Sequence, residues 1–321
     1  MRKVQISNLI IIGMGVSLVA CRSPTPLSSV QSKAPTAIPE GSPMESFANV
    51  SRIAAASPAT QTIEYKAYTL ARSVVHTVSI PPQSQVLVTP AVSGTVEPIG
   101  ELAQRYGAIA AINGGYFDPK NQKTISPVTL QGNAIAKPED NQRLMFNPDL
   151  LPYLDKILNR SEFRRYQCGK VIQYDITLRQ TVPRADCQLQ DSLGAGPQLL
   201  PNATLAEEGF LEIRNQKVIR DPLGISQLNA RSAIGITRNN TIIWVMVAQK
   251  PNLASSGMTL QELTDFMKTL GIEKAMNLDG GSSSSLYYQG KTIYGKVQDG
   301  KPIQRSIKSA LLIQPIKKPE N

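Results

Sequence analysis

The stretch AMNLDGGSSSSL, residues 275–286, places one carboxylate just before two glycines and a run of serines. Glycine permits sharp turns and lets backbone approach a ligand closely. A carboxylate exchanges protons or binds sugar hydroxyls, while hydroxyls and backbone amides hold oxygen atoms. The candidate positions are Asn277, Asp279, Gly280, Gly281, Ser283 and Ser284. This composition suits an anionic or polyhydroxylated substrate, and the alternative is a hairpin turn followed by a flexible serine run.

A second stretch, NGGYFD, combines an amide, two glycines, an aromatic ring and a carboxylate at Asn113, Gly114, Gly115, Tyr116 and Asp118. Asp118 is the candidate partner for Asp279, because glycoside hydrolysis usually employs two carboxylates about 5 to 9.5 Å apart. The alternative is again a tight turn, since Asp before proline is a common turn former.

Both stretches follow a helix and a strand. Residues 100–106 read as a short helix closed by Gly107, and residues 108–112 as an apolar strand. Residues 259–270 read as a helix with a Thr259/Glu262 capping box and Gly271 at its end, followed by a second strand. If both strands run parallel in one sheet, their carboxyl ends bring Asn113 and Asn277 to one edge. Chance similarity is the alternative.

A third glycine-rich turn contains Gly196, and two arginines stand near strand boundaries. Arg231 just precedes the apolar run 233–236, and its guanidinium could hold a phosphate by paired hydrogen bonds. Arg305 is the second candidate. The alternative for either arginine is a surface ion pair.

The sequence disfavours a Ser-His-Asp hydrolase and a zinc enzyme. The single histidine, His76, lies in a strand pattern far from the glycine-rich turns, which disfavours a Ser-His-Asp triad. A zinc site would lack its usual ligands, so we predict no metal and no cofactor. The net charge of +10 suits anionic partners. Without an RNA-binding aromatic signature or zinc-finger spacing, nucleic acid is not an expected partner.

The N-terminus reads as a targeting segment. Arg2 and Lys3 precede an apolar stretch over 9–20 that is too short to span a bilayer. Leu18-Val19-Ala20-Cys21 resembles the lipobox of bacterial lipoproteins, which makes residues 1–21 a signal peptide with a lipidated Cys21. The alternative is an ordinary exported protein cut nearby. We therefore expect export to the bacterial cell envelope and a lipid anchor in a membrane.

Residues 22–60 are rich in proline and serine and read as a disordered tether. From about residue 61 to 316 the pattern is that of a folded domain in which strands dominate. Residues 139–190 are polar and without a clear period, which predicts an irregular insertion that forms a lid or rim. Cys168 and Cys187 remain as a pair, and export favours a disulfide between them. Free buried cysteines are the alternative.

Taken together, these motifs resemble the phosphodiester glycosidase family over most of residues 70–314. The resemblance lies in five segments in the family's order: Asn113–Phe117, Gly196–Leu199, Arg231–Gly235, Met258–Leu260 and Asn277–Gly281. The chain departs from the family at Ser282, where many members carry a third glycine, and at Ser309, where asparagine is frequent.

The resemblance implies an α/β (α+β) domain with a mixed central β-sheet and few helices. It implies hydrolysis of the glycosidic linkage of a sugar-1-phosphodiester, with an N-acetylhexosamine expected, in envelope polysaccharide or glycan metabolism. Asp279 and Asn113 would be catalytic. The residues expected to bind substrate are Gly114, Gly115, Tyr116, Asp118, Gly196, Arg231, Asn277, Gly280, Gly281, Ser283, Ser284 and Arg305. The alternatives are a non-catalytic envelope protein that binds glycans or anionic cell-wall polymers, and a metal-dependent phosphodiesterase.

Overall fold

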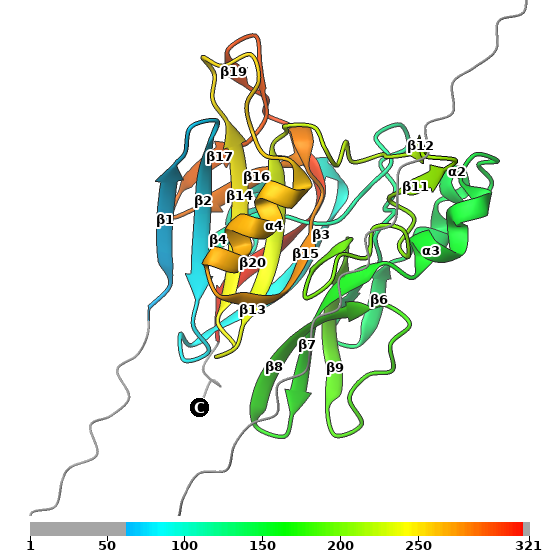
Figure 1. Cartoon of the computed structure of the whole chain (residues 1–321). Helices are drawn as coiled ribbons and strands as arrows, with labels where there is room; N and C mark the ends of the chain where they lie inside the picture. The colour runs from blue at the N-terminus through cyan, green and yellow to red at the C-terminus, as the bar shows by residue number, and fades with distance from the viewer. Residues whose placement is uncertain (1–61, 317–321) are drawn as a thin grey trace, which may run out of the picture. The chain divides into compact units, whose positions relative to one another are not determined.

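The computed structural model describes residues 62–316, in which most strands belong to three antiparallel sheets (Figure 1). The signal peptide, Cys21 and the tether predicted over 22–60 lie outside these described residues. None of the helices within 62–316 is long and apolar enough to cross a membrane.

The first sheet has six strands, which include the strongly apolar segment IIWVMVAQ. Their order is β1 (Glu64–Thr69), β2 (Ser73–Ile80), β14 (Ile242–Gln249), β13 (Arg231–Thr237), β15 (Ile272–Asn277) and β10 (Gln198–Leu200). A continuous apolar run in a strand indicates that both faces are covered. In β14, Trp244 and Met246 face one core while Val245 and Val247 face another. Trp244, the single tryptophan of the chain, is fully buried.

The second sheet has five strands and shares the larger core with the first. Their order is β17 (Lys291–Tyr294), β16 (Ser285–Tyr288), β4 (Ala110–Asn113), β20 (Ile307–Pro315) and β3 (Val86–Glu97). Because side chains alternate along a strand, Ile112 of β4 joins Trp244 in the shared core, and Ala111 faces the opposite side. The two sheets therefore pack face to face.

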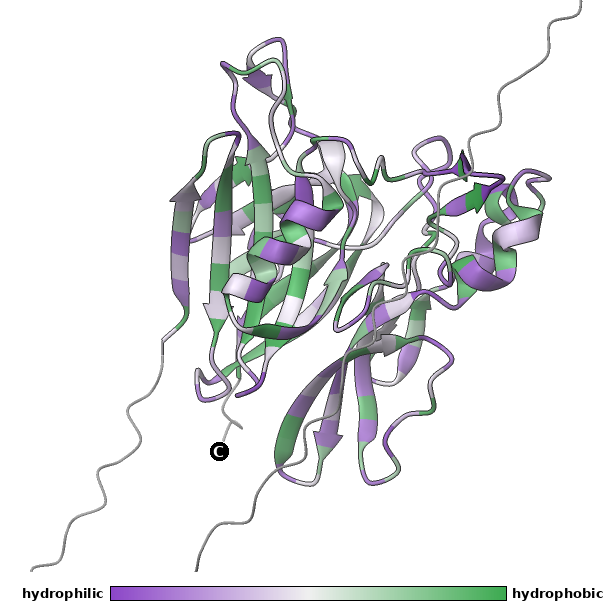
Figure 2. Cartoon of the chain, in the orientation of Figure 1, coloured by the Kyte–Doolittle hydropathy of each residue, from purple (hydrophilic) through white to green (hydrophobic). Residues whose placement is uncertain are grey.

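Each of these two sheets carries one helix on its outer face. Helix α4 (Leu260–Thr269) covers the first sheet with Leu263 and Met267, and its outward face is hydrophilic (Figure 2). Helix α1 (Ile99–Arg105) covers the second sheet with Leu102. The Thr259/Glu262 capping box and the helix ends at Gly107 and Gly271, both with positive φ, are as the sequence predicts.

The third sheet is built largely from residues 139–190, so the prediction that this segment is irregular is wrong. Its order is β6 (Asn133–Ala136), β5 (Val128–Leu130), β9 (Gln188–Gly194), β7 (Ser161–Cys168) and β8 (Val171–Leu178). Phe163 and Ile176 reach the shared core. Its charged residues suggest a solvent-exposed segment, but they form ion pairs inside the sheet. Arg164 pairs with Glu162 at 2.5 Å, and Arg165 pairs with Asp191 at 2.6 Å.

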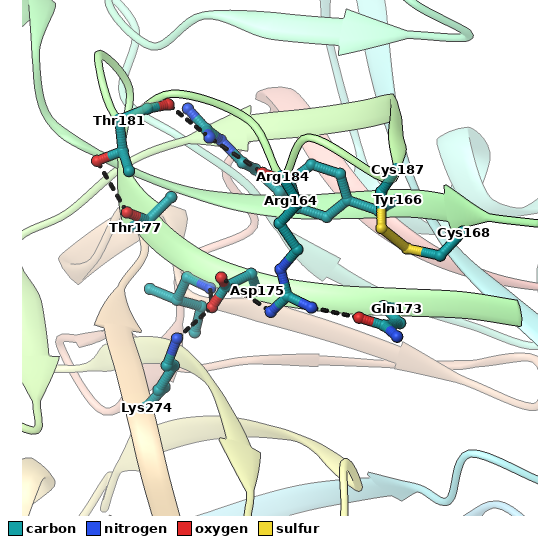
Figure 3. Close-up of polar contacts among 11 residues, drawn as sticks. Arg164, Tyr166, Cys168, Gln173, Asp175, Thr177, Thr181, Arg184, Cys187 and Lys274 are labelled. Carbon is teal, nitrogen blue, oxygen red and sulfur yellow. Dashed lines mark hydrogen bonds and ion pairs between the residues drawn. A yellow bond between two sulfur atoms is a disulfide. The ribbon is translucent and has the colours of Figure 1, made fainter.

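The disulfide predicted between Cys168 and Cys187 is present and joins the end of β7 to the loop before β9 (Figure 3). In the same view Asp175 of β8 accepts a charged hydrogen bond from Lys274 of β15 at 2.5 Å. The third sheet is thus fastened to the first by an ion pair as well as by the core.

The remaining elements are short. They are α2 (Gln142–Met145), α3 (Leu154–Leu158), the 3₁₀ turns η1 (Pro138–Asp140), η2 (Leu151–Tyr153) and η3 (Gly281–Ser283), and the hairpins β11 (Glu212–Arg214) with β12 (Lys217–Arg220) and β18 (Val297–Gln298) with β19 (Lys301–Pro302).

The expected α/β (α+β) class with few helices is confirmed, but the two predicted strand-Asn units do not share a sheet. Strand β4 belongs to the second sheet and β15 to the first, and every pairing between named strands in residues 62–316 is antiparallel. Short apolar strands carry no signal that distinguishes one sheet from two facing sheets.

Candidate active site

The two predicted loops meet where the first and second sheets face each other. The Asp279 backbone N–H donates to the Gly114 carbonyl at 2.9 Å. The Asn113 side chain donates from Nδ2 to the Asp279 carbonyl at 2.6 Å. Its Oδ1 accepts from Ser232 Oγ at 2.7 Å and from the Ser285 N–H at 3.1 Å. Asn113 is fully buried and does not line the cavity. It therefore positions the Asp279 loop through hydrogen bonds and has no direct access to a ligand in the cavity.

Gly114 and Gly115 are required by close packing. A Cβ on Gly114 would lie 2.6 Å from Ser309 Oγ, and one on Gly115 would lie 2.2 Å from the Gly194 carbonyl oxygen. The Gly115 N–H donates to Ser309 Oγ at 3.1 Å. Ser309, one of the departures from the family pattern, therefore supports this turn directly.

A cavity of about 290 Å³ opens beside these loops. Its polar wall is formed by Asp279, Asn277, Asn229 and three arginines, Arg160, Arg220 and Arg231. Its apolar wall is formed by Tyr116, Phe117, Ile125, Leu144, Leu150, Ile157, Phe210, Pro222 and Leu223. Gly280 and Gly281 complete the lining. Such a mixture of apolar surface and a few convergent polar groups is typical of small-molecule sites.

Asp279 is the only carboxylate among the described residues that line this cavity. Burial raises the pKa of its carboxyl group to about 6, although hydrogen bonds from Ser283 and from the Gly280 N–H, the latter at 3.0 Å, and the charge of Arg305 oppose this rise. A carboxyl group with such a pKa changes protonation near neutrality, which is what a general acid or base requires.

Asn277 lines the cavity, and one of its side-chain atoms is a buried acceptor without a partner among the described residues. Its Nδ2 donates to Tyr116 Oη at 2.8 Å and to the Leu278 carbonyl at 2.5 Å, and the Tyr116 hydroxyl donates to the Gly196 carbonyl at 2.7 Å. This chain of donors fixes which end of the amide is nitrogen. Asn277 Oδ1 is buried and has no hydrogen-bond partner among the described residues. A ligand that donates a hydrogen bond would satisfy it.

Gly196 does not line the cavity but supports Tyr116, which does. Its φ is +83°, and a Cβ there would lie 2.1 Å from Glu208 Oε2. Glu208 is fully buried and accepts from the Ser161 N–H at 2.7 Å, from Ser161 Oγ at 2.6 Å and from the Gln198 N–H at 2.9 Å. This carboxylate, which the sequence analysis missed, holds two loops together and is not free for catalysis.

Arg231 lines the cavity but is committed to the backbone. Its Nε donates to the Met258 carbonyl at 3.1 Å, and its terminal nitrogens donate to the Leu223, Gly224 and Gln227 carbonyls at 2.7 to 2.9 Å. A guanidinium has five N–H groups, so one remains. Arg231 therefore cannot hold a phosphate by two parallel hydrogen bonds, as the sequence predicted. Its hydrogen bonds instead fix residues 223–227, which contribute Leu223 to the cavity wall.

Asp118 and Arg305 do not line the cavity. The Asp118 carboxylate accepts from the Lys120 N–H at 2.8 Å and from Arg143 Nε at 2.8 Å. Burial alone would raise the pKa of Asp118, but these contacts lower it overall, which disfavours a proton-donating role. The Arg305 guanidinium lies 5.5 Å from the centre of the Phe117 ring, and its charge acts on Asp279.

Two serines of the Asp279 loop differ in their contacts: Ser283 hydrogen-bonds the Asp279 carboxylate, and Ser284 does not. Gly281 has a φ of +60° and begins η3, which turns Ser283 toward the Asp279 carboxylate. Ser284 is fully buried, and its Oγ has no hydrogen-bond partner among the described residues. It does not line the cavity, so its predicted contact with substrate finds no support in the geometry.

Arg160 is the cavity residue that the sequence analysis missed most clearly. It lies just before β7, is 7% exposed, and donates from Nε to the Glu208 carbonyl at 3.1 Å. Its guanidinium lies 3.7 Å from the centre of the Phe210 ring and 5.5 Å from that of Tyr116. The only available signal was its place in a basic stretch, which by itself resembles a solvated surface.

Comparison with known proteins supports the resemblance. The family model described as phosphodiester glycosidase matches residues 106–314, more than half of the chain. The chain belongs to the phosphodiester glycosidase family. No curated protein sequence matches it.

Two solved structures share the fold. The zebrafish N-acetylglucosamine-1-phosphodiester alpha-N-acetylglucosaminidase catalytic domain, auto-inhibited by its pro-peptide, is 17% identical with a TM-score of 0.56, over 81% of this chain and 84% of that chain. A hypothetical protein from Synechocystis is 18% identical with a TM-score of 0.52, over 78% of this chain. This chain covers 61% of the Synechocystis protein's length.

In this member of the family, the motif residues fall into two groups. Asp279, Asn277, Tyr116, Arg231, Gly280 and Gly281 line the cavity. Asn113, Gly114, Gly115 and Gly196 hold the loops that carry them. The segment 139–190 adds Leu144, Leu150, Ile157 and Arg160 to the wall, which agrees with a rim.

Proposed function

We propose that this protein hydrolyses the glycosidic bond of a sugar-1-phosphodiester, with Asp279 as the group that accepts the proton. The observation that carries the proposal is that a single carboxylate, with a pKa near 6, lines a cavity that also holds arginines. Family membership supports a hydrolase of this kind.

A single carboxylate favours a phosphate leaving group over an alcohol. Glycosidases that expel an alcohol usually need one carboxyl group to protonate the leaving oxygen and a second to activate water or attack carbon. A phosphate monoester leaves as a stable anion and needs no proton donor. One base at Asp279 is then sufficient. The reaction does not need a second carboxylate such as Asp118, which does not line the cavity.

In the proposed reaction, ionised Asp279 accepts a proton from water, whose oxygen bonds to the anomeric carbon. The bond from that carbon to the bridging oxygen breaks, and its electron pair leaves with the phosphate. Asn277 Oδ1 accepts a hydrogen bond from a sugar hydroxyl or an acetamido N–H, and the latter would suit an N-acetylhexosamine. Asn113 keeps the Asp279 loop in place.

The test compares the purified protein with its Asp279→Asn variant on an N-acetylhexosamine 1-phosphodiester. We expect the variant to lose at least about 100-fold in kcat, because it has no base. Asp265→Asn, which makes the same chemical change on the exposed face of α4, serves as the control. Equal rates for wild type and Asp279→Asn would remove Asp279 from the mechanism.

Two further results would replace the proposal. Binding of glycans or anionic polymers without turnover would make the protein a non-catalytic envelope protein. Reaction in ¹⁸O-labelled water separates the two bond cleavages: label in the sugar supports cleavage at the anomeric carbon, whereas label in the phosphate would indicate a phosphodiesterase.

We also propose that the protein acts in the bacterial cell envelope as a lipoprotein anchored through Cys21. The proposal rests on the charged start, the apolar stretch and the Leu-Val-Ala-Cys sequence. Its substrate would then be an envelope polysaccharide or glycan.

A further inference from the structure

Three arginines line the cavity: Arg231 has one free N–H group, whereas Arg220 and Arg160 each donate only from Nε, and Arg160 is the more buried of these two. Arg231 commits four N–H groups to backbone carbonyls. Arg220 donates from Nε to the Gly209 carbonyl at 2.7 Å and lies over Tyr153 at the partly exposed rim. Arg160 donates only from Nε, and its two terminal nitrogens have no hydrogen-bond partner among the described residues.

The environment of Arg160 makes this freedom unusual. The residue is 7% exposed and its guanidinium stacks on Phe210, so water solvates it poorly. A buried charge whose donors lack partners is destabilising. The nearby charge of Glu208 favours the charged form of Arg160, but its carboxylate makes no hydrogen bond with the guanidinium. The Glu208 oxygens accept from Ser161, Gln198 and Thr204, and Arg160 reaches only the Glu208 backbone carbonyl.

A second observation points to a ligand in the same cavity. Asn277 lines the cavity and is 1% exposed, and its Oδ1 has no donor among the described residues. The cavity therefore offers free guanidinium donors on one residue and a free amide acceptor on another. A molecule that satisfies both carries an anionic group and a hydroxyl or amide N–H.

We propose that Arg160 is the principal phosphate-binding residue of this site, and that it makes the cavity select sugar phosphates over neutral sugars. The proposal rests on the proposed function for the identity of the anion. The planar guanidinium presents Nη1 and Nη2 as a fork that matches two phosphate oxygens. Stacking on Phe210 holds that fork in one orientation and reduces the entropy lost on binding.

Arg160 also explains why the third sheet belongs to the site. It immediately precedes β7, and the Ser161 N–H and hydroxyl bind Glu208, which packs against Gly196. The start of β7 is thus fixed relative to the loop that holds Tyr116 and Asn277. Selectivity for the anion therefore depends on a segment that lies outside the five motifs of the family.

The experiment measures binding of N-acetylglucosamine 1-phosphate and of N-acetylglucosamine to the full chain by calorimetry. We expect Arg160→Gln to weaken binding of the phosphate by about tenfold or more, the scale of a charged hydrogen bond, and to leave binding of the neutral sugar unchanged. Arg238→Gln removes the same charge from an arginine whose side chain is 90% exposed and should change neither affinity.

A second variant guards against misfolding. Arg160→Lys keeps the charge and an aliphatic stem but loses the fork, and we expect an affinity for the phosphate between those of wild type and Arg160→Gln. If Arg160→Gln does not fold, Arg160→Lys alone decides: wild-type affinity for the phosphate in that variant overturns the proposal.

The outcomes for Arg160 and for the proposed function are separable. Equal loss of affinity in Arg160→Gln and Arg238→Gln, or equal loss for the phosphate and the neutral sugar, overturns the assignment of Arg160. Selective loss at Arg160 without hydrolysis by wild type supports the anion site and overturns the hydrolase. Hydrolysis by wild type with phosphate binding independent of Arg160 supports the hydrolase and overturns the anion site.

Discussion

Asp279 derives its properties from the residues around it more than from its own chemistry. Its backbone is held by Asn113 and Gly114, and its carboxyl group accepts hydrogen bonds from Gly280 and Ser283 within a buried pocket wall. The charge of Arg305 favours ionisation, but burial dominates. The same residue in an exposed Asp-Gly turn would be an ordinary acid.

The raised pKa of Asp279 predicts a pH dependence of stability. The folded state, with a pKa of about 6 against 3.8, holds the proton more tightly than the unfolded chain. This contribution to stability is therefore complete below about pH 4 and is lost as the pH rises through 6. The shift corresponds to at most about 3 kcal/mol.

Asp279→Asn removes this titration. We expect the free energy of unfolding of Asp279→Asn, relative to wild type, to increase between pH 4 and pH 7 by about 1 to 3 kcal/mol. Urea denaturation at each pH measures the difference. A difference that stays constant over this range would show that the Asp279 pKa is the same in the folded and unfolded states.

At the residue scale the sequence pointed to Asp279 and Asn277, and both line the cavity. It misjudged Arg231 and missed Arg160. An isolated arginine carries no sequence signal for whether its donors meet backbone carbonyls, as at Arg231, or remain free beside an aromatic ring.

Among the elements, β4 and β15 decide the geometry of the site, and they belong to different sheets. Helices α1 and α4 and both strand-Asn units were predictable from periodicity, caps and terminal glycines. The assignment to two sheets was not, because Ala111 and Ile112 would alternate in the same way in either sheet. Strand β7 and its neighbour β8 were missed because the buried arginines of β7 read as surface charge.

Asn113 links the sheets, since it ends β4 and contacts Asp279, Ser232 of β13 and Ser285 of β16. We expect Asn113→Ala to lower the free energy of unfolding by about 2 to 3 kcal/mol, because buried donors and an acceptor lose their partners. Activity should fall even where the variant is folded.

Urea denaturation and kinetics of the folded variant measure these effects. Asn202→Ala makes the same change at an exposed position and should alter neither stability nor rate. Equal free energies of unfolding for the two variants would contradict the linking role of Asn113.

On the scale of the whole molecule, the site is assembled from distant parts of the chain. Tyr116, Arg160, Phe210 and Asp279 all line one cavity. The structure describes the chain from residue 62, and we propose that the segment before it holds a signal peptide and a tether.

The proposed anchor yields a test on the complete protein. In a bacterial host that processes lipoproteins, we expect the wild-type chain in the membrane fraction and the Cys21→Ser variant outside it, because the variant has no thiol to receive lipid. Fractionation followed by immunoblotting measures the distribution. The same distribution for both chains would reject Cys21 as the anchor.

The burial of Trp244 between the first and second sheets has a spectroscopic consequence. Because the chain has no other tryptophan, its fluorescence reports on one place, the shared core. Emission should shift to longer wavelength when the two sheets separate and water reaches the indole. Trp244 does not line the cavity, so a ligand that binds there should leave this emission unchanged while it raises the temperature at which the shift occurs.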